Sequence, residues 1–197
     1  NRFIAGNKCD TPLGNNIKNK DIPNLYEYKY HRVFDYKPLE MDKAKRGVIG
    51  IPRVLNMYEN YPLWFTLFTN LGFRVQMSGE SSKKLYEKGL TSIVSETACY
   101  PAKMSHGHVE DLIESGIKNI FYPCIIHESR EFSNATDTFN CPVVTSYAEV
   151  IKNNMDSIEK NNVNFMNPFL PIANKNKLKK RLKNVLSIFS ISQKEIN

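Results

Sequence analysis

The sequence lacks any apolar run of about 20 residues, the length at which a helix spans a bilayer. Its first residues do not resemble a secretory signal, and the chain opens on asparagine rather than methionine. We therefore expect a cytoplasmic protein without membrane contact, excised from a longer chain. At 197 residues, with 41% hydrophobic and 11% aromatic content, the sequence is long enough for a soluble domain with a sizeable core.

Several chemical signatures are also missing. The sequence has neither a G-x-x-x-x-G-K-[ST] loop nor an Asp-x-Gly phosphate turn, so ATP hydrolysis should lie outside this piece. No C-x-x-C pair exists, which excludes the zinc-ribbon and ferredoxin signatures. The four cysteines are too few for the dense disulfide scaffold of a small secreted protein.

From residue 46 onward, short apolar runs alternate with helical patterns. The runs at residues 47–51, 73–77, 117–122 and 143–145 predict four strands. Helices are predicted from Asn60 to Gly72, from Ser81 or Ser82 to Gly89, from Ala102 to Gly116, and from Ser146 to Met155. This alternation predicts an α/β fold, a Rossmann-like parallel sheet with helices on both faces.

The remaining segments suggest a division of the chain. We expect residues 1–45 to form an irregular arm packed on the body, residues 46–172 the Rossmann-like domain, and residues 173–197 a basic amphipathic C-terminal helix. Six Lys and Arg residues between 175 and 183 supply most of the net charge of +7. A solvated helix face explains them better than a nucleic-acid site. The apolar face of this helix predicts an interface with a domain outside this piece.

Three cysteines occupy similar places in the pattern. Cys99, Cys124 and Cys141 each lie within two residues of a proline and beside an apolar run. If those runs are strands of one parallel sheet, the cysteines converge on the crevice where such sheets place their sites. Thiolates suit iron–sulfur clusters or zinc, but the long spacings by themselves favour packing residues over a metal site.

Other polar residues gather near Cys99, namely Glu96, Lys103, His106 and His108. We expect Glu96 to cap the following helix, and one histidine to orient the turn while the other faces solvent. Lys103 could place a positive charge near the thiolates. Arg53, directly after the first strand, could bind an anion or form a surface ion pair.

The longer motifs resemble a known family. The stretches GIPRVLNMYE (50–59), SETACYPAK (95–103), HGH (106–108), FYPC (121–124), NCP (140–142) and VTSY (144–147) are together similar to the uncharacterised domain of CoA-substrate-specific enzyme activases, large activators of 2-hydroxyacyl-CoA dehydratase. That domain is in turn similar to the dehydratase and double-cubane-cluster subunits. The resemblance covers roughly residues 1–172.

The resemblance implies an anaerobic iron–sulfur system. In it an ATP-hydrolysing activator delivers a low-potential electron to a partner whose cluster is held by cysteines in Rossmann-like lobes. By position, Cys99, Cys124 and Cys141 match the candidate ligands of a [4Fe–4S] or larger cluster, and Cys9 is a fourth candidate. The implied partners are an ATPase activator domain and a dehydratase-like subunit.

Three functions compete at this point. The leading hypothesis is an iron–sulfur redox module of an ATP-dependent dehydratase activator or related reductase. The alternative is a non-catalytic docking or scaffold domain whose cysteines are structural. A cysteine-nucleophile enzyme pairing Cys99 with His106 or His108 is less favoured, because it leaves the other matched cysteines unexplained. The sharpest expectation is that the three sulfurs point toward a common pocket.

Overall fold

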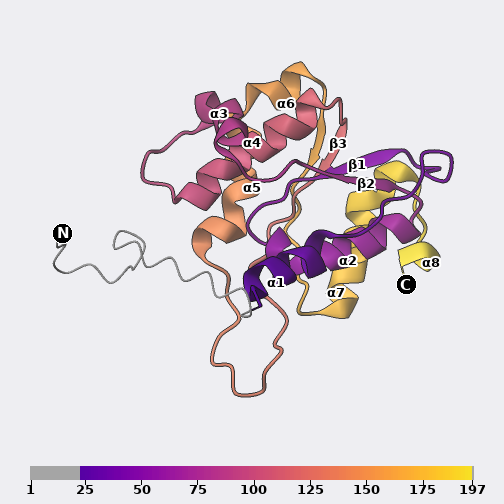
Figure 1. The fold of residues 1–197 in the computed structure, drawn as a ribbon. Helices are drawn as coiled ribbons and strands as arrows, with labels where there is room; N and C mark the ends of the chain where they lie inside the picture. The colour runs from indigo at the N-terminus through magenta and orange to yellow at the C-terminus, as the bar shows by residue number, and fades with distance from the viewer. Residues whose placement is uncertain (1–22, 197) are drawn as a thin grey trace, which may run out of the picture.

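A four-stranded parallel sheet organises the chain (Figure 1). The structure is a computed structural model that describes residues 23–196. The strands are β1 (Val48–Ile51), β2 (Arg74–Met77), β3 (Asn119–Phe121) and β4 (Asn164–Met166), in the order β2-β1-β3-β4. These strands pair with one another in parallel. The predicted α/β fold class is confirmed.

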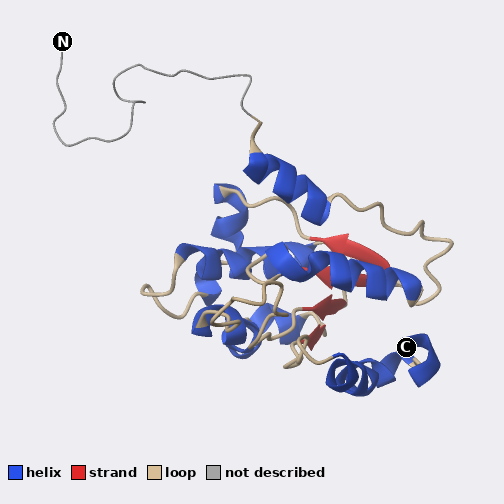
Figure 2. Cartoon of the chain, turned by 90° about the horizontal axis from the view of Figure 1, so that it is seen from below, coloured by secondary structure: helices blue, strands red, loops and turns tan. Residues whose placement is uncertain are grey.

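Helices cover both faces of the sheet. They are α1 (Leu25–Phe34), α2 (Met57–Asn70), α3 (Lys83–Lys88), α4 (Tyr100–Glu114), α5 (Pro142–Asn154), α6 (Asp156–Lys160), α7 (Lys175–Val185) and α8 (Gln193–Ile196), with short 3₁₀ turns at Leu90–Ser92 and Leu186–Phe189. Figure 1 shows α3 to α6 on one side of the sheet and α1, α2 and α7 on the other, and Figure 2 shows the strands with helices around them. Within residues 23–196, no helix is long and apolar enough to cross a membrane.

The core between α2 and the sheet is aromatic. The side chains of Trp64 and Phe68 are fully buried and meet Phe121 of β3 edge-on, with ring centroids 5.1 and 4.9 Å apart. Phe68 also contacts Phe73, beside β2, at 5.8 Å. Such edge-to-face pairs add about 0.5–1.5 kcal/mol each to the burial of the rings. This layer fixes α2 across the middle of the sheet.

The predicted fourth strand is wrong. Residues 143–145 lie in the first turn of α5, and the strand is instead Asn164–Met166, beside β3. Cys141 takes the N-cap position and Pro142 the first helical position, where the fixed φ of proline favours a helix start. Two adjacent valines therefore do not outweigh the helical pattern that follows them.

Helix α2 also starts earlier than predicted. It begins at Met57, and Pro62, expected in the first turn, lies inside the helix. Tertiary contacts hold the earlier turn. Met57 is fully buried, and the buried Asn56 side chain donates from Nδ2 to the carbonyl of Pro123, at 2.9 Å. This contact joins α2 to the segment after β3, which no local pattern could reveal.

The apolar face of α7 is buried within the chain itself. Leu182 and Leu186 are buried in the core of the chain, and Phe189 meets Phe73 edge-on at 4.9 Å. The expectation of an external interface on this face is therefore wrong, because the hydrophobic core of the chain itself covers it. The division of the chain into arm, body and C-terminal helix stays a prediction.

Helices α3 and α4 approach closely through two glycines. A Cβ atom on Gly107 would lie 2.0 Å from the carbonyl oxygen of Leu85, and one on Gly89 would lie 2.3 Å from the amide nitrogen of Gly107. Both distances are far inside van der Waals contact with backbone atoms that have little room to move. The two glycines therefore set how deeply α4 is seated.

We expect Gly107→Ala to destabilise the protein by about 1–3 kcal/mol, because overpacking of the helix contact outweighs the better helix propensity of alanine. Chemical denaturation monitored by circular dichroism would measure the change. Gly79→Ala is the matched control, since a Cβ there meets its nearest neighbour at an ordinary 3.5 Å. An unchanged midpoint for Gly107→Ala would contradict the close contact.

Candidate functional site

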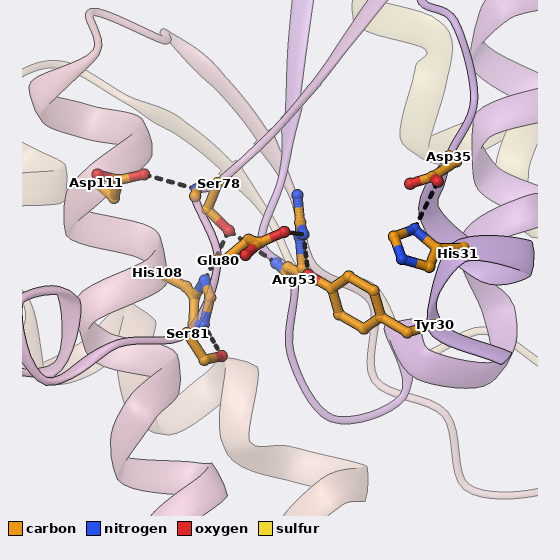
Figure 3. A network of polar contacts seen from close by, with 10 residues as sticks. Tyr30, His31, Asp35, Arg53, Ser78, Glu80, Ser81, His108 and Asp111 are labelled. Carbon is orange, nitrogen blue, oxygen red and sulfur yellow. Dashed lines mark hydrogen bonds and ion pairs between the residues drawn. The ribbon is translucent and has the colours of Figure 1, made fainter. Parts of the chain in front are cut away.

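Polar residues converge at the carboxyl ends of β1 and β2 (Figure 3). Arg53 follows β1, and Ser78 and Ser81 belong to the segment after β2. His108 reaches the same place from α4. The carboxyl ends of parallel strands form the edge where open α/β sheets place ligands.

His108 lies at the centre of this network. Its Nδ1 is 2.8 Å from Ser78 Oγ, and its Nε2 is 2.9 Å from Ser81 Oγ. The backbone N–H of Arg53 donates to Ser78 Oγ at 2.9 Å. We assign His108 the tautomer in which the Ser78 hydroxyl donates to Nδ1. Nε2–H then donates to Ser81. Burial, and secondarily the charge of Arg53, lowers the pKa of His108 to about 4, so the ring is neutral at pH 7.

Asp111 ties this segment to α4. Its carboxylate accepts the backbone N–H of Gly79 at 2.9 Å and pairs with Lys88 at 2.6 Å. Burial acts to raise the pKa of Asp111, but these two donors outweigh it and hold the pKa below its usual value. Lys88 also pairs with Glu114 at 2.7 Å. The segment after β2 is therefore held at several points along one face of α4.

Arg53 links the site to α1. Its guanidinium lies 5.4 Å from the ring centre of Tyr30 and 5.3 Å from that of Phe34, and Nη1 donates to the Tyr30 hydroxyl. Nη1 is also 3.7 Å from the carboxylate of Glu80. The Nε atom is buried and has no hydrogen-bond partner among the described residues. The Arg53 side chain thus forms the ion pair that was one of its two expected roles.

A cavity of about 380 Å³ opens beside these groups. Its wall includes Arg53 and Leu55 after β1, Ser81 after β2, and Tyr100, Met104 and His108 along α4. Leu55 has a φ of 42°, which a bulky residue rarely adopts. Backbone strain of this kind concentrates at functional sites.

His106, which precedes Gly107 as His108 follows it, forms a second buried hydrogen-bond network. Its Nδ1 lies 2.7 Å from Ser92 Oγ, and its Nε2 lies 3.2 Å from the Tyr147 hydroxyl of α5. Burial lowers the pKa of His106 to about 4. The expectation that one histidine faces solvent is wrong, because both rings are 0% exposed and each has polar partners on neighbouring elements.

Two cysteines begin helices. Cys99 is the N-cap residue of α4 and Cys141 that of α5, each is followed by proline in the first turn, and neither helix has a side-chain cap. Both thiols are free and exposed. Helices α4 and α5 pack together. Burial raises the pKa of Tyr147 on α5, and the neighbouring Cys99 adds to this shift.

Cys124 is placed differently. It follows β3 in the hydrophobic core and is 1% exposed. Burial, together with the charge of Glu149, raises the pKa of the Cys124 thiol to about 11. Among residues 23–196 there is no group of three or more His, Cys, Asp or Glu side chains that could hold a metal ion. Cys9 lies outside the described residues, and the four-cysteine ligand set stays a prediction.

The two remaining site candidates lie on the surface. Glu96 does not cap α4, because the N-cap residue is Cys99. The Nζ of Lys103 donates to the backbone carbonyl of Glu96 at 3.3 Å, which closes the loop before the helix. The sequence interpretation missed Ser78 and Ser81. Their position directly after the predicted strand 73–77, at the carboxyl end of a parallel strand, was a usable signal.

The family model of the CoA enzyme activase uncharacterised domain (DUF2229) matches residues 48–197. The chain belongs to this family. The matched part of the activase domain runs from β1 through α8, so it contains the cavity, both buried histidines, and Cys99, Cys124 and Cys141. No curated protein and no solved structure matches the chain.

We expect the activase domain to lose stability as the pH falls from about 6.5 toward 4. The unfolded chain binds protons on both histidines in this window, whereas the folded chain does not until the pH approaches the lowered pKa values of about 4. Each histidine can account for a loss on the order of 2–3 kcal/mol. Urea denaturation at pH 7, 6 and 5 measures the slope.

The double variant His106→Gln, His108→Gln should flatten this pH dependence. His31→Gln, on an exposed part of α1, is the control for a histidine substitution outside the buried networks. A double variant that keeps the full pH dependence would show that other groups cause it.

Proposed function

We propose that this activase domain is the iron–sulfur redox module of an ATP-dependent 2-hydroxyacyl-CoA dehydratase activator, or of a related low-potential reductase. Family membership supports the activase assignment. The observation that carries the redox part is the placement of Cys99 and Cys141, two exposed free thiols that begin the neighbouring helices α4 and α5.

A helix start suits a cluster ligand. The first N–H groups of a helix carry a partial positive charge and favour a thiolate over a thiol. Because α4 and α5 have no side-chain cap, these N–H groups are available to sulfur. Hydrogen bonds to the sulfurs also tune the potential of iron–sulfur clusters. When bound, such a cluster would supply one-electron transfer at low potential.

Cys124 is not accessible as a cluster ligand in this structure. Cys124 is a protonated thiol in the core, and metal binding needs a thiolate. Two cysteines fit the chemistry, and the remaining ligands would come from Cys9, from Cys124 after a rearrangement, or from a partner. The proposed partners are an ATPase activator domain and a dehydratase-like subunit.

A second candidate is a non-catalytic docking or scaffold domain. The burial of Cys124 favours it, as does the lack of a preformed metal-binding group among residues 23–196. In that case Cys124 is a small core residue, and the cysteines at the helix starts are surface residues without a metal.

We expect protein purified and reconstituted anaerobically with iron and sulfide to bind a cluster. Iron and acid-labile sulfide analysis, with electron paramagnetic resonance of the reduced protein, measures it. Cys99→Ser and Cys141→Ser should each lower bound iron about tenfold or more, because the hydroxyl is a poor ligand for this metal.

Cys124→Ser should have the same effect if the core opens to complete the set, and Cys9→Ser should matter less. Colourless, iron-free protein under these conditions would contradict the redox proposal and favour the scaffold. So would reconstituted protein whose iron content is unchanged in both Cys99→Ser and Cys141→Ser.

A further inference from the structure

We infer that the cavity at the carboxyl ends of β1 and β2 binds a small oxyanion, a carboxylate or a phosphate, attached to an apolar or aromatic body. Its volume of about 380 Å³ falls within the range of small-molecule sites. The inference does not depend on the iron–sulfur proposal, because no cysteine among residues 23–196 lines the cavity.

Arg53 supplies the positive charge that would bind the oxyanion. Its side chain is only 12% exposed, yet its one guanidinium hydrogen bond within residues 23–196 is that of Nη1 to Tyr30, and Nε has no partner. A buried guanidinium with unused donors is costly to leave unpaired. Its planar fork matches the oxygens of a carboxylate or phosphate.

The carboxylate of Glu80 pairs with Arg53 in place of a ligand oxyanion, but only weakly. Its carboxylate lies 3.7 Å from Arg53 Nη1, beyond hydrogen-bond distance, and its side chain is 77% exposed. A long pair with one partner this exposed contributes little, because solvent screens the carboxylate. A ligand oxyanion at hydrogen-bond distance would replace Glu80 with little loss.

The hydroxyl of Ser81 adds a directed donor. In the tautomer assigned to His108, Nε2–H donates to Ser81 Oγ, and the Ser81 proton is then left to donate to a group in the cavity. Because the His108 ring is neutral and enclosed between two serines, it orients Ser81 without adding charge. The site therefore offers one strong positive charge and one neutral donor.

The other walls select an apolar body. Leu55, Met104 and the ring of Tyr100 present mainly carbon atoms to the cavity. Tyr100 is held by a ring contact with Tyr86 at 5.1 Å. A ligand that is charged throughout would leave its polar groups unpaired against these walls.

Titrations followed by ¹⁵N–¹H correlation spectra test the inference with three probes, benzoate, phenyl phosphate and benzamide. Benzoate and phenyl phosphate distinguish the two oxyanions, and benzamide keeps the ring without the charge. We expect saturable shifts at Arg53, Ser81 and His108 with at least one anion, and about tenfold weaker binding of benzamide. Equal binding of all three probes, or no saturable shift with either anion, would overturn the inference.

Two variants should act in opposite directions on the affinity for the anion that binds. Glu80→Gln removes the competing carboxylate and should tighten binding about three- to fivefold. Arg53→Gln should weaken it about tenfold or more. Glu87→Gln, which makes the same charge change on an exposed part of α3, is the control and should have little effect.

Arg53 also packs on α1, so the correlation spectrum of Arg53→Gln must first show a folded protein. Met104→Trp tests the cavity without changing any charge. Its larger side chain fills the cavity, so this variant should not bind the anion. If Glu80→Gln and Glu87→Gln tighten binding equally, the effect is general electrostatics and the proposed site is wrong.

Discussion

The structure depends on the close packing of α4 against α3. Gly107 lets the helix touch the backbone of Leu85, and the two neutral histidines beside it are buried with hydrogen-bond partners on neighbouring elements. His106 is joined to Ser92 and to Tyr147 of α5, and His108 to the two serines after β2. Charging either ring in this place would leave an ion without solvation. The fold therefore requires that the imidazole rings of His106 and His108, which lie beside the Gly107 contact, stay neutral.

The same helix serves both candidate sites. Cys99 stands at its start, exposed to solvent, and the face that follows lines the cavity with Tyr100, Met104 and His108. The two sites differ in their chemistry. The helix start presents backbone N–H groups with a partial positive charge, whereas the cavity has a fixed guanidinium and mainly apolar walls. A displacement of α4 would alter both candidate sites, so the contact between α3 and α4 affects their geometry as well as the stability of the fold.

Much of the fold could be predicted from local patterns. The first three strands, α3 and α4 follow from apolar runs bounded by glycine and by capping serine, and the motifs around the cysteines and histidines indicated the activase family. The predicted strand at residues 143–145 failed because a helix start at Cys141 and Pro142 overrides two valines. The early start of α2 depends on Asn56 and Pro123, 67 positions apart.

The sequence by itself determined the alternation of strands and helices, the family, and the residue types available for chemistry, because period, turn residues and motifs are local properties. Only the tertiary structure decided where those residues lie. Cys124 is in the core while Cys99 and Cys141 are exposed, both histidines are buried, and Arg53 meets Tyr30 and Phe34 of α1. Burial, and with it the protonation of a thiol or an imidazole, depends on partners that are distant in the chain.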